Sequence, residues 1–215
     1  MNVRPIFLSV VLSMAAVAGA QQPSVHDVAK RMDDHYNHLR SLRLDYTEHY
    51  RGLGMDRTEN GTLLLKKPGR MRWNYAAPVG KVFVLDGRNA YFYTPGDAQA
   101  QKIPAKQLDD LRSPLRFLLG HTQIEKELNN ITMVTNGGYA QISGVPKGME
   151  QRVKRLTITC NPQNGIITGL KLEEIDGSIT EFHFSNLKEN VPVKDSDFEF
   201  TAPAGVMIVS GLPPT

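Results

Sequence analysis

Short stretches of alternating hydrophobic and polar residues run along most of this chain, which is the pattern of β-strands. Between positions 70 and 75, for example, Met71, Trp73 and Tyr75 alternate with polar residues, so one face of the strand is apolar and the other polar. Turn signals separate such stretches at Glu59-Asn60-Gly61, Asp86-Gly87, Asn164-Gly165 and Asp176-Gly177. The pattern predicts about ten or eleven antiparallel strands, the last two at 198–200 and 206–209.

Two segments have the helical period instead. From Ser24 to Ser41, apolar residues recur at three- and four-residue steps behind a capping serine, which predicts an N-terminal helix with one buried face. Midway along the chain, Ser113-Pro114 starts and Gly120 ends a second predicted helix, and 124–128 adds one further turn.

These elements predict a mainly β, single-domain fold. A long antiparallel sheet must twist and curl, so we expect an unclosed barrel with one helix before it and one inserted midway. A curled sheet covered by separate helices encloses an apolar interior, in which a lipid would fit.

The first twenty residues have the composition of a secretory signal peptide. A basic start is followed by a short apolar run and by Ala18-Gly19-Ala20, with small residues where a signal peptidase reads. The run is too short to anchor the chain in a bilayer, which takes about 20 apolar residues. We therefore expect cleavage after Ala20, a mature domain of residues 21–215, and a soluble periplasmic protein.

Charge and cysteine content narrow the function classes. Of the 25 basic and 22 acidic residues, the expected cleavage removes one, Arg4, which leaves 24 and 22 and a net charge of +2. Such a nearly neutral chain does not predict a nucleic-acid partner. The single cysteine, Cys160, lies in an alternating stretch, so we interpret it as a packing residue of a strand.

Candidate catalytic and metal-binding residues are few. His35 and His38 are three residues apart on the first predicted helix, but no other histidine has paired metal-ligand spacing. The sequence has no Gly-x-Ser-x-Gly nucleophile motif and no phosphate-binding glycine loop. We predict no enzymatic activity, no metal and no cofactor.

The stretch 66–75 combines basic and aromatic residues, as nucleic-acid-binding strands do. The strand period, however, directs Met71, Trp73 and Tyr75 together to one face and the arginines to the other. Periodicity alone does not distinguish an ordinary core strand from the wall of a ligand cavity.

Five segments in order resemble the outer-membrane lipoprotein carrier family, LolA. They are Gly61-x-Leu63-x-Leu65-Lys66-Lys67-Pro68-Gly69-Arg70-Met71-Arg72-Trp73, Val82 to Gly87, Tyr91-Phe92-Tyr93-x-Pro95, Ser113-Pro114-Leu115 to Leu119, and Phe198-x-Phe200-x-Ala202-Pro203-x-Gly205-Val206. The resemblance covers nearly all of the predicted mature chain.

The resemblance implies an open barrel with a helical lid over an apolar cavity for acyl chains. The cavity residues that we predict are Leu63, Leu65, Met71, Trp73, Tyr75, Phe83, Leu85, Tyr91 and Tyr93, and the lid residues are Leu115, Leu118 and Leu119. The implied cargo is an acylated lipoprotein, received from an inner-membrane ABC transporter and passed to an outer-membrane receptor similar to LolB. The protein is expected to be a monomer.

One position departs from the family pattern. Lys67 stands where the family has an arginine that bonds to the lid, and a lysine lacks the planar, multi-donor group of arginine. Lys67 and Arg70 are therefore both candidates for holding the lid closed.

Three other functions remain open at this point. A LolB-like receptor would need a cysteine at the cleavage site, which this chain lacks. A binding or shuttle module for another lipid or amphiphile has the same sequence features as a lipoprotein carrier. An enzyme on the same scaffold would need a catalytic constellation that the sequence does not display.

Overall fold

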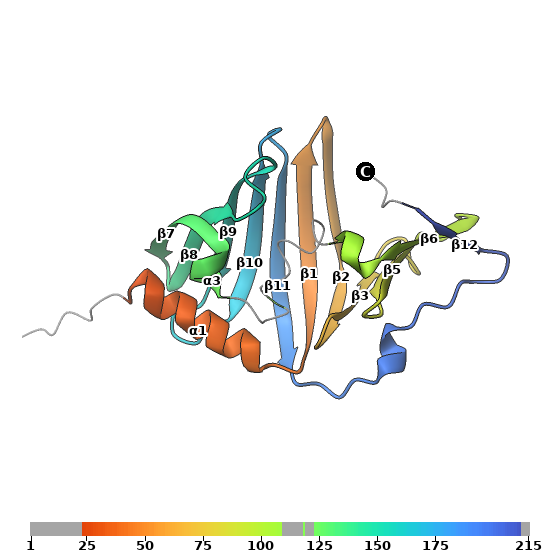
Figure 1. Ribbon diagram of the computed structural model, residues 1–215, viewed down its shortest axis with the longest axis horizontal. Coiled ribbons are helices and arrows are strands. Elements are labelled where there is room, and N and C mark those ends of the chain that lie inside the picture. Colours follow the sequence, from red (N-terminus) through yellow and green to blue (C-terminus); the bar gives the residue numbers. More distant parts are fainter. Residues whose placement is uncertain (1–22, 109–117, 119–122, 212–215) are drawn as a thin grey trace, which may run out of the picture.

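In a computed structural model, twelve strands form one continuous sheet (Figure 1). The structure describes residues 23–108, 118 and 123–211. Along the sheet the strand order is β12-β6-β5-β4-β3-β2-β1-β11-β10-β9-β8-β7. The strands are β1 (Ser41–Gly52), β2 (Met55–Lys66), β3 (Arg70–Tyr75), β4 (Val82–Leu85), β5 (Asn89–Tyr93), β6 (Gln99–Pro104), β7 (Leu128–Asn136), β8 (Tyr139–Pro146), β9 (Val153–Cys160), β10 (Ile167–Glu174), β11 (Ile179–Glu189) and β12 (Met207–Ser210).

The sheet is unclosed, as predicted. Its two end strands, β7 and β12, do not pair with each other in the described structure. All neighbouring strands are antiparallel except β12, which runs parallel to β6. The mainly β, open-barrel prediction is confirmed, with twelve strands rather than ten or eleven and with this one parallel pair.

The N-terminal helix α1 (Val25–His38) lies across one face of the sheet (Figure 1). Ser24 caps it, and its buried side faces the sheet with Val28, Ala29, Met32 and Tyr36. The prediction that this helix continues to Ser41 is wrong, because Leu39 is already extended and Ser41 begins β1. We call the face of the sheet that α1 covers the inner face.

The inserted region begins with a 3-10 helix, η1 (Ala105–Leu108), and ends with one helical turn, α3 (Ile124–Glu127), as predicted for 124–128. Of the predicted helix 113–120, only Leu118 is described: it is helical and 1% exposed. The backbone N–H of Ile124 donates to the Asp33 carboxylate, which joins α3 to α1. Within the described residues, we find no helix long and apolar enough to span a bilayer.

Two local predictions are wrong. The turn predicted at Glu59–Gly61 is instead at Leu53-Gly54, and Gly61 lies inside β2. A β-carbon at Gly61 would be 2.0 Å from the carbonyl oxygen of Asn74, so this glycine permits close strand approach rather than a turn. The strand predicted at 198–200 is also absent, because Phe198 ends a second 3-10 helix, η2 (Asp195–Phe198).

The other turn predictions are confirmed. The Asp86 carboxylate accepts hydrogen bonds from the backbone N–H groups of Arg88 and Asn89 and so shapes the β4–β5 turn. Asn164-Gly165 connects β9 to β10, and Asp176-Gly177 connects β10 to β11.

Apolar side chains form two buried clusters on opposite faces of the sheet. The large one lies on the inner face, between the strands, α1 and Leu118. The small one consists of Val82, Val84, Tyr93 and Ala100, with Phe200 and Val206 from the C-terminal segment packed against it. We call the second side the outer face.

Candidate functional site

Seven of the nine predicted cavity residues lie together on the inner face. Two rows cross the strands β2, β3 and β4: Leu65 pairs with Met71 and Met71 with Leu85, while Leu63 pairs with Trp73 and Trp73 with Phe83. Tyr75 follows on the same face of β3. Leu63, Leu65, Met71, Trp73 and Leu85 are buried, and Tyr75 and Phe83 are partly buried against them. The pattern of alternation therefore predicted correctly that these side chains share one face of the sheet.

Beside these rows lies a group of rings that we call the aromatic belt, formed by Tyr46, Trp73, Tyr75, Phe182 and Phe184. The Trp73 ring centroid is 4.4 Å from that of Tyr46 and 5.8 Å from that of Phe182, both edge-to-face. The indole N–H of Trp73 donates to the Met71 sulfur at 2.8 Å. The aromatic belt thus presents a wide apolar surface, because the one indole N–H in it is bonded to the neighbouring Met71 sulfur.

Charged residues follow the aromatic belt at one end, and we call Glu48, Glu59 and Lys81 the polar end of the inner face. Glu48 lies two residues after Tyr46 on β1 and pairs directly with Glu59 on β2. Lys81 forms an ion pair with Glu59 and lies 4.2 Å from the Tyr75 ring centroid. Burial raises the pKa of the Glu48 carboxyl and of the Tyr75 hydroxyl. The inner face is therefore amphipathic. We call the two rows of apolar side chains on β2 to β4 the apolar floor, and it leads to a charged end that is largely shielded from water.

Helix α1 is attached to the strands by Lys67. Its ammonium donates a hydrogen bond to the backbone carbonyl of Tyr36, and its backbone N–H donates to the carbonyl of Arg40. Burial lowers the pKa of Lys67. The Tyr36 hydroxyl in turn accepts a hydrogen bond from the backbone N–H of Ile167 on β10. Tyr36 thus holds α1 against the sheet through two hydrogen bonds, one at its backbone carbonyl and one at its hydroxyl.

The remaining lid predictions are tested only in part. Leu118 is buried in the inner-face cluster, whereas Leu115 and Leu119 lie outside the described residues. The guanidinium of Arg70 is 3.2 Å from the Asp195 carboxylate, which Lys66 also contacts at 2.5 Å. Of the two candidates for holding a cover closed, Lys67 is the one bonded to a helix over the inner face.

The resemblance places Tyr91 and Tyr93 in the cavity, but the structure places them on the outer face. On β5 they alternate with Ala90, which belongs to the inner-face cluster, so their side chains point the other way. Their rings lie 5.3 and 6.2 Å from the Phe200 ring. They hold the C-terminal segment against the sheet and are separated from the other seven residues.

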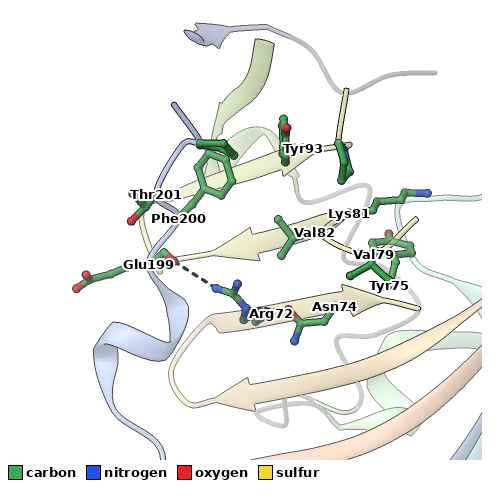
Figure 2. A pocket seen from close by; sticks show the side chains of 13 residues that line it. Arg72, Asn74, Tyr75, Val79, Lys81, Val82, Tyr93, Glu199, Phe200 and Thr201 are labelled. Atoms are coloured by element: carbon green, nitrogen blue, oxygen red, sulfur yellow. Dashed lines mark hydrogen bonds between the residues drawn. The ribbon is translucent and has the colours of Figure 1, made fainter. Parts of the chain in front are cut away.

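A pocket of about 630 Å³ also lies on the outer face, between the sheet and the C-terminal segment (Figure 2). Val82 and Tyr93 line it from the sheet, and Phe200 lines it from the C-terminal segment. The Arg72 guanidinium donates to the backbone carbonyl of Glu199 at 3.3 Å and so fixes one wall. The wall is polar as well as apolar, unlike the inner-face floor.

Comparison with known proteins identifies the family. The family model for the outer membrane lipoprotein carrier protein LolA matches residues 47–201. The chain belongs to the LolA family. The match includes β2 to β4 and every ring of the aromatic belt except Tyr46, which lies one residue before it. Most of the inner-face surface described above is therefore within the matched region.

Similar carriers from several bacteria support the same assignment. The outer-membrane lipoprotein carrier protein of Chromobacterium violaceum is 24% identical over 97% of this chain and 99% of its own length. That of Sodalis glossinidius is 29% identical over 90% of this chain and 92% of its own length. The chain therefore has nearly the full length of these LolA proteins.

Solved structures show the same fold at low sequence identity. An uncharacterized conserved protein from Thermus thermophilus has a TM-score of 0.55 and 8% identity, over 86% of this chain and 98% of its own. A DUF1329 family protein from Desulfovibrio piger has a TM-score of 0.50 and 16% identity, over 81% and 95%. These similarities concern the fold alone.

Several residues of this LolA-type inner face were not among the sequence candidates. Tyr46, Phe182 and Phe184 belong to the aromatic belt, and Glu48 belongs to the polar end. The signal was present, because Leu42, Leu44 and Tyr46 alternate on one strand and Phe182 and Phe184 on another. It required the knowledge that β1 and β11 are neighbours at the centre of the sheet.

The histidines and the cysteine have structural surroundings. His35 lies 3.0 Å from the Glu189 carboxylate and His49 lies 2.7 Å from that of Asp56. The described residues contain no group of three potential metal ligands. Cys160 is fully buried in the inner-face cluster, as the strand-packing interpretation predicts, and burial raises the pKa of its thiol to about 11.

Proposed function

We propose that this LolA-family chain is a periplasmic carrier that binds the acyl chains of lipoproteins on its inner face and delivers them to an outer-membrane receptor. The observation that supports it most strongly is the continuous apolar floor of β2 to β4 and the aromatic belt, which form one buried cluster with residues of α1 and Leu118, in a member of this family. Binding and release are the whole activity, and no covalent bond is made or broken.

The physical need for such a surface follows from the hydrophobic effect. Each acyl methylene removed from water contributes about 0.8 kcal/mol, so a lipoprotein with several chains does not leave a membrane at a useful rate unaided. A carrier replaces the membrane with its own apolar side chains. In the structure these side chains are buried in one cluster that also includes residues of α1 and Leu118, so cargo has to displace part of this packing, which we call the cover.

The cover therefore has to open at moderate cost. A hydrogen bond to a charged group contributes about 1.5 to 3 kcal/mol, and the bond from Lys67 to the Tyr36 carbonyl is of this kind. Such a bond favours the closed state in the absence of cargo and is weak enough to break when acyl chains enter. The partners in this proposal are an inner-membrane ABC transporter that supplies the cargo and a LolB-like receptor that accepts it.

Substitution of Met71 tests the proposal. Met71→Glu places a carboxylate in the apolar floor, which costs several kcal/mol unless it protonates or reaches water. We expect the variant to lose release of lipoproteins from spheroplasts that supply the ABC transporter. Met55→Glu is the matched control, because Met55 is 54% exposed at the start of β2.

Circular dichroism of both variants checks that the fold is retained. Normal lipoprotein release by a folded Met71→Glu protein would contradict the proposal. Release of a defined free lipid in place of lipoproteins would instead favour a shuttle for another amphiphile.

A further inference from the structure

The polar end of the inner face contains a carboxylate without a counter-ion of its own. Glu48 and Glu59 are direct neighbours on β1 and β2, and Lys81 forms an ion pair with Glu59. Glu48 makes no hydrogen bond or ion pair of its own within the described part of the chain, and the cations Arg57 and Lys81 only partly offset the rise that burial causes in its pKa. It lies half-buried between Glu59 and Phe182 of β11, a position in which an unpaired negative charge is costly.

A second polar group at the same place also lacks a partner. The Tyr46 side chain is 2% exposed, and its hydroxyl has no hydrogen-bond partner in the described structure. The hydroxyl lies near Tyr75, Glu48 and Glu59, all of which raise its pKa in addition to the effect of burial. Leaving a buried hydroxyl without a partner is costly, so a ligand that bonds to the Tyr46 hydroxyl relieves that cost.

The protein already holds one cation in these surroundings. The Lys81 ammonium lies over the Tyr75 ring at 4.2 Å and contacts Glu59, with only 12% of its side chain exposed. Arg57, the other nearby cation, lies over the Tyr50 ring at 5.5 Å and is exposed. Carboxylates beside aromatic ring faces are the surroundings in which proteins bind ammonium groups.

We propose that Glu48 and the Tyr46 hydroxyl form a subsite for a cationic group of the cargo, an ammonium or guanidinium close to its acyl chains. The cation would donate hydrogen bonds to the Glu48 carboxylate and to the Tyr46 oxygen, beside the rings of the aromatic belt. The inference rests on the proposed acyl-chain function, because the polar end continues the apolar floor and a head group bound there belongs to chains bound on that floor. An anionic head group would meet the two carboxylates instead.

Alkyl probes of equal length test the subsite. Dodecylammonium, dodecyl maltoside and dodecyl sulfate, each below its micelle concentration, differ in the charge of the head group. Trp73 is the only tryptophan of the chain and lies in the aromatic belt, so its fluorescence reports binding at this surface. We expect the full-length mature protein to bind dodecylammonium about tenfold more tightly than dodecyl maltoside.

Two variants and one control test whether Glu48 and Tyr46 cause this preference for the ammonium probe. Glu48→Gln should reduce the affinity for dodecylammonium about tenfold and leave that for dodecyl maltoside unchanged. Tyr46→Phe should reduce the same preference by a smaller factor. Glu199→Gln, on the exposed C-terminal segment, should bind all three probes as the wild type does.

The outcomes separate this inference from the function on which it rests. Equal binding of the ammonium and maltoside probes by the wild type, or an unchanged preference in Glu48→Gln, would overturn the cation subsite and leave acyl-chain binding intact. Failure of all three probes to bind would overturn both.

Discussion

The side-chain ammonium of Lys67 bonds to the backbone carbonyl of Tyr36, in the last turn of α1. This carbonyl also accepts a hydrogen bond from the backbone N–H of Leu39 at 3.3 Å, and because carbonyls at the C-terminal end of a helix carry partial negative charge, a cation stabilises them further. Lys67 lies in the turn between β2 and β3, the strands that form the apolar floor. One bond therefore links the turn beside the floor to the C-terminal end of α1.

Removal of this bond should loosen α1. We expect Lys67→Met to raise amide hydrogen exchange in Val25–His38 by an amount that corresponds to about 1.5 to 3 kcal/mol. Lys67→Arg should preserve protection, because its guanidinium can bond to the same carbonyl. Lys66→Met, which removes only an exposed contact with Asp195, is the control. Equal exchange in all four proteins would show that Lys67 does not hold the cover.

A second contact of Tyr36 should matter more for global stability. Tyr36→Phe leaves the backbone N–H of Ile167 buried without its acceptor, which should lower the free energy of unfolding in urea by about 1 to 3 kcal/mol. Tyr50→Phe is the control, since its hydroxyl makes only a 3.3 Å contact with Ser178 at a partly exposed position. An equal decrease in the free energy of unfolding in both variants would show that the hydrogen bond from the Ile167 N–H to the Tyr36 hydroxyl contributes nothing of its own.

The ionised carboxylate of Glu48 should lower the free energy of unfolding at neutral pH. Its folded-state pKa is raised, first by burial and then by Glu59, against the opposing effects of Arg57 and Lys81. The folded protein therefore binds the proton more tightly than the unfolded chain, so this contribution to stability falls as pH rises from about 4.3 through the folded pKa. We expect Glu48→Gln to be more stable than the wild type at pH 7 and equally stable near pH 3.

Urea unfolding of both proteins at several pH values measures this difference. A Glu48→Gln protein that is less stable than the wild type at pH 7 would show that the carboxylate has a stabilising partner. It would then be a structural residue rather than one available to a ligand.

The N-terminal prediction concerns processing. The apolar run that ends in Ala18-Gly19-Ala20 predicts that the mature chain begins at Gln21 and fractionates with soluble periplasmic proteins. The intact mass of the purified protein checks this directly. A product that retains Met1, or one found only with membranes, would contradict the signal-peptide interpretation.

Alternation of residue types predicted the strands of the floor because each strand there has one buried and one wetter face. Leu63, Leu65, Met71 and Trp73 obey it and lie on the inner face. The same rule was insufficient for Tyr91 and Tyr93, because the C-terminal segment with Phe200 covers the outer face and buries residues there as well. When both faces of a strand are covered, residue polarity does not indicate which face a given side chain occupies.

Long-range contacts account for the other differences. Asn60-Gly61 has the composition of a turn, but Gly61 is required where the carbonyl of Asn74 approaches β2. The sequence around Glu48 does not indicate its position, because only its pairing with Glu59 and Phe182 places it beside the aromatic belt. Such positions depend on the register of strands that are distant in sequence, which local composition does not encode.

Native mass spectrometry of the protein purified from the periplasm that produces it tests the central claim most directly. We predict a complex of the mature chain with an acylated lipoprotein, present in the wild type and in Met55→Glu and absent in Met71→Glu. A wild-type protein that carries no acylated polypeptide, or that carries the same cargo after Met71→Glu, would contradict the assignment of the inner face as the acyl-chain site.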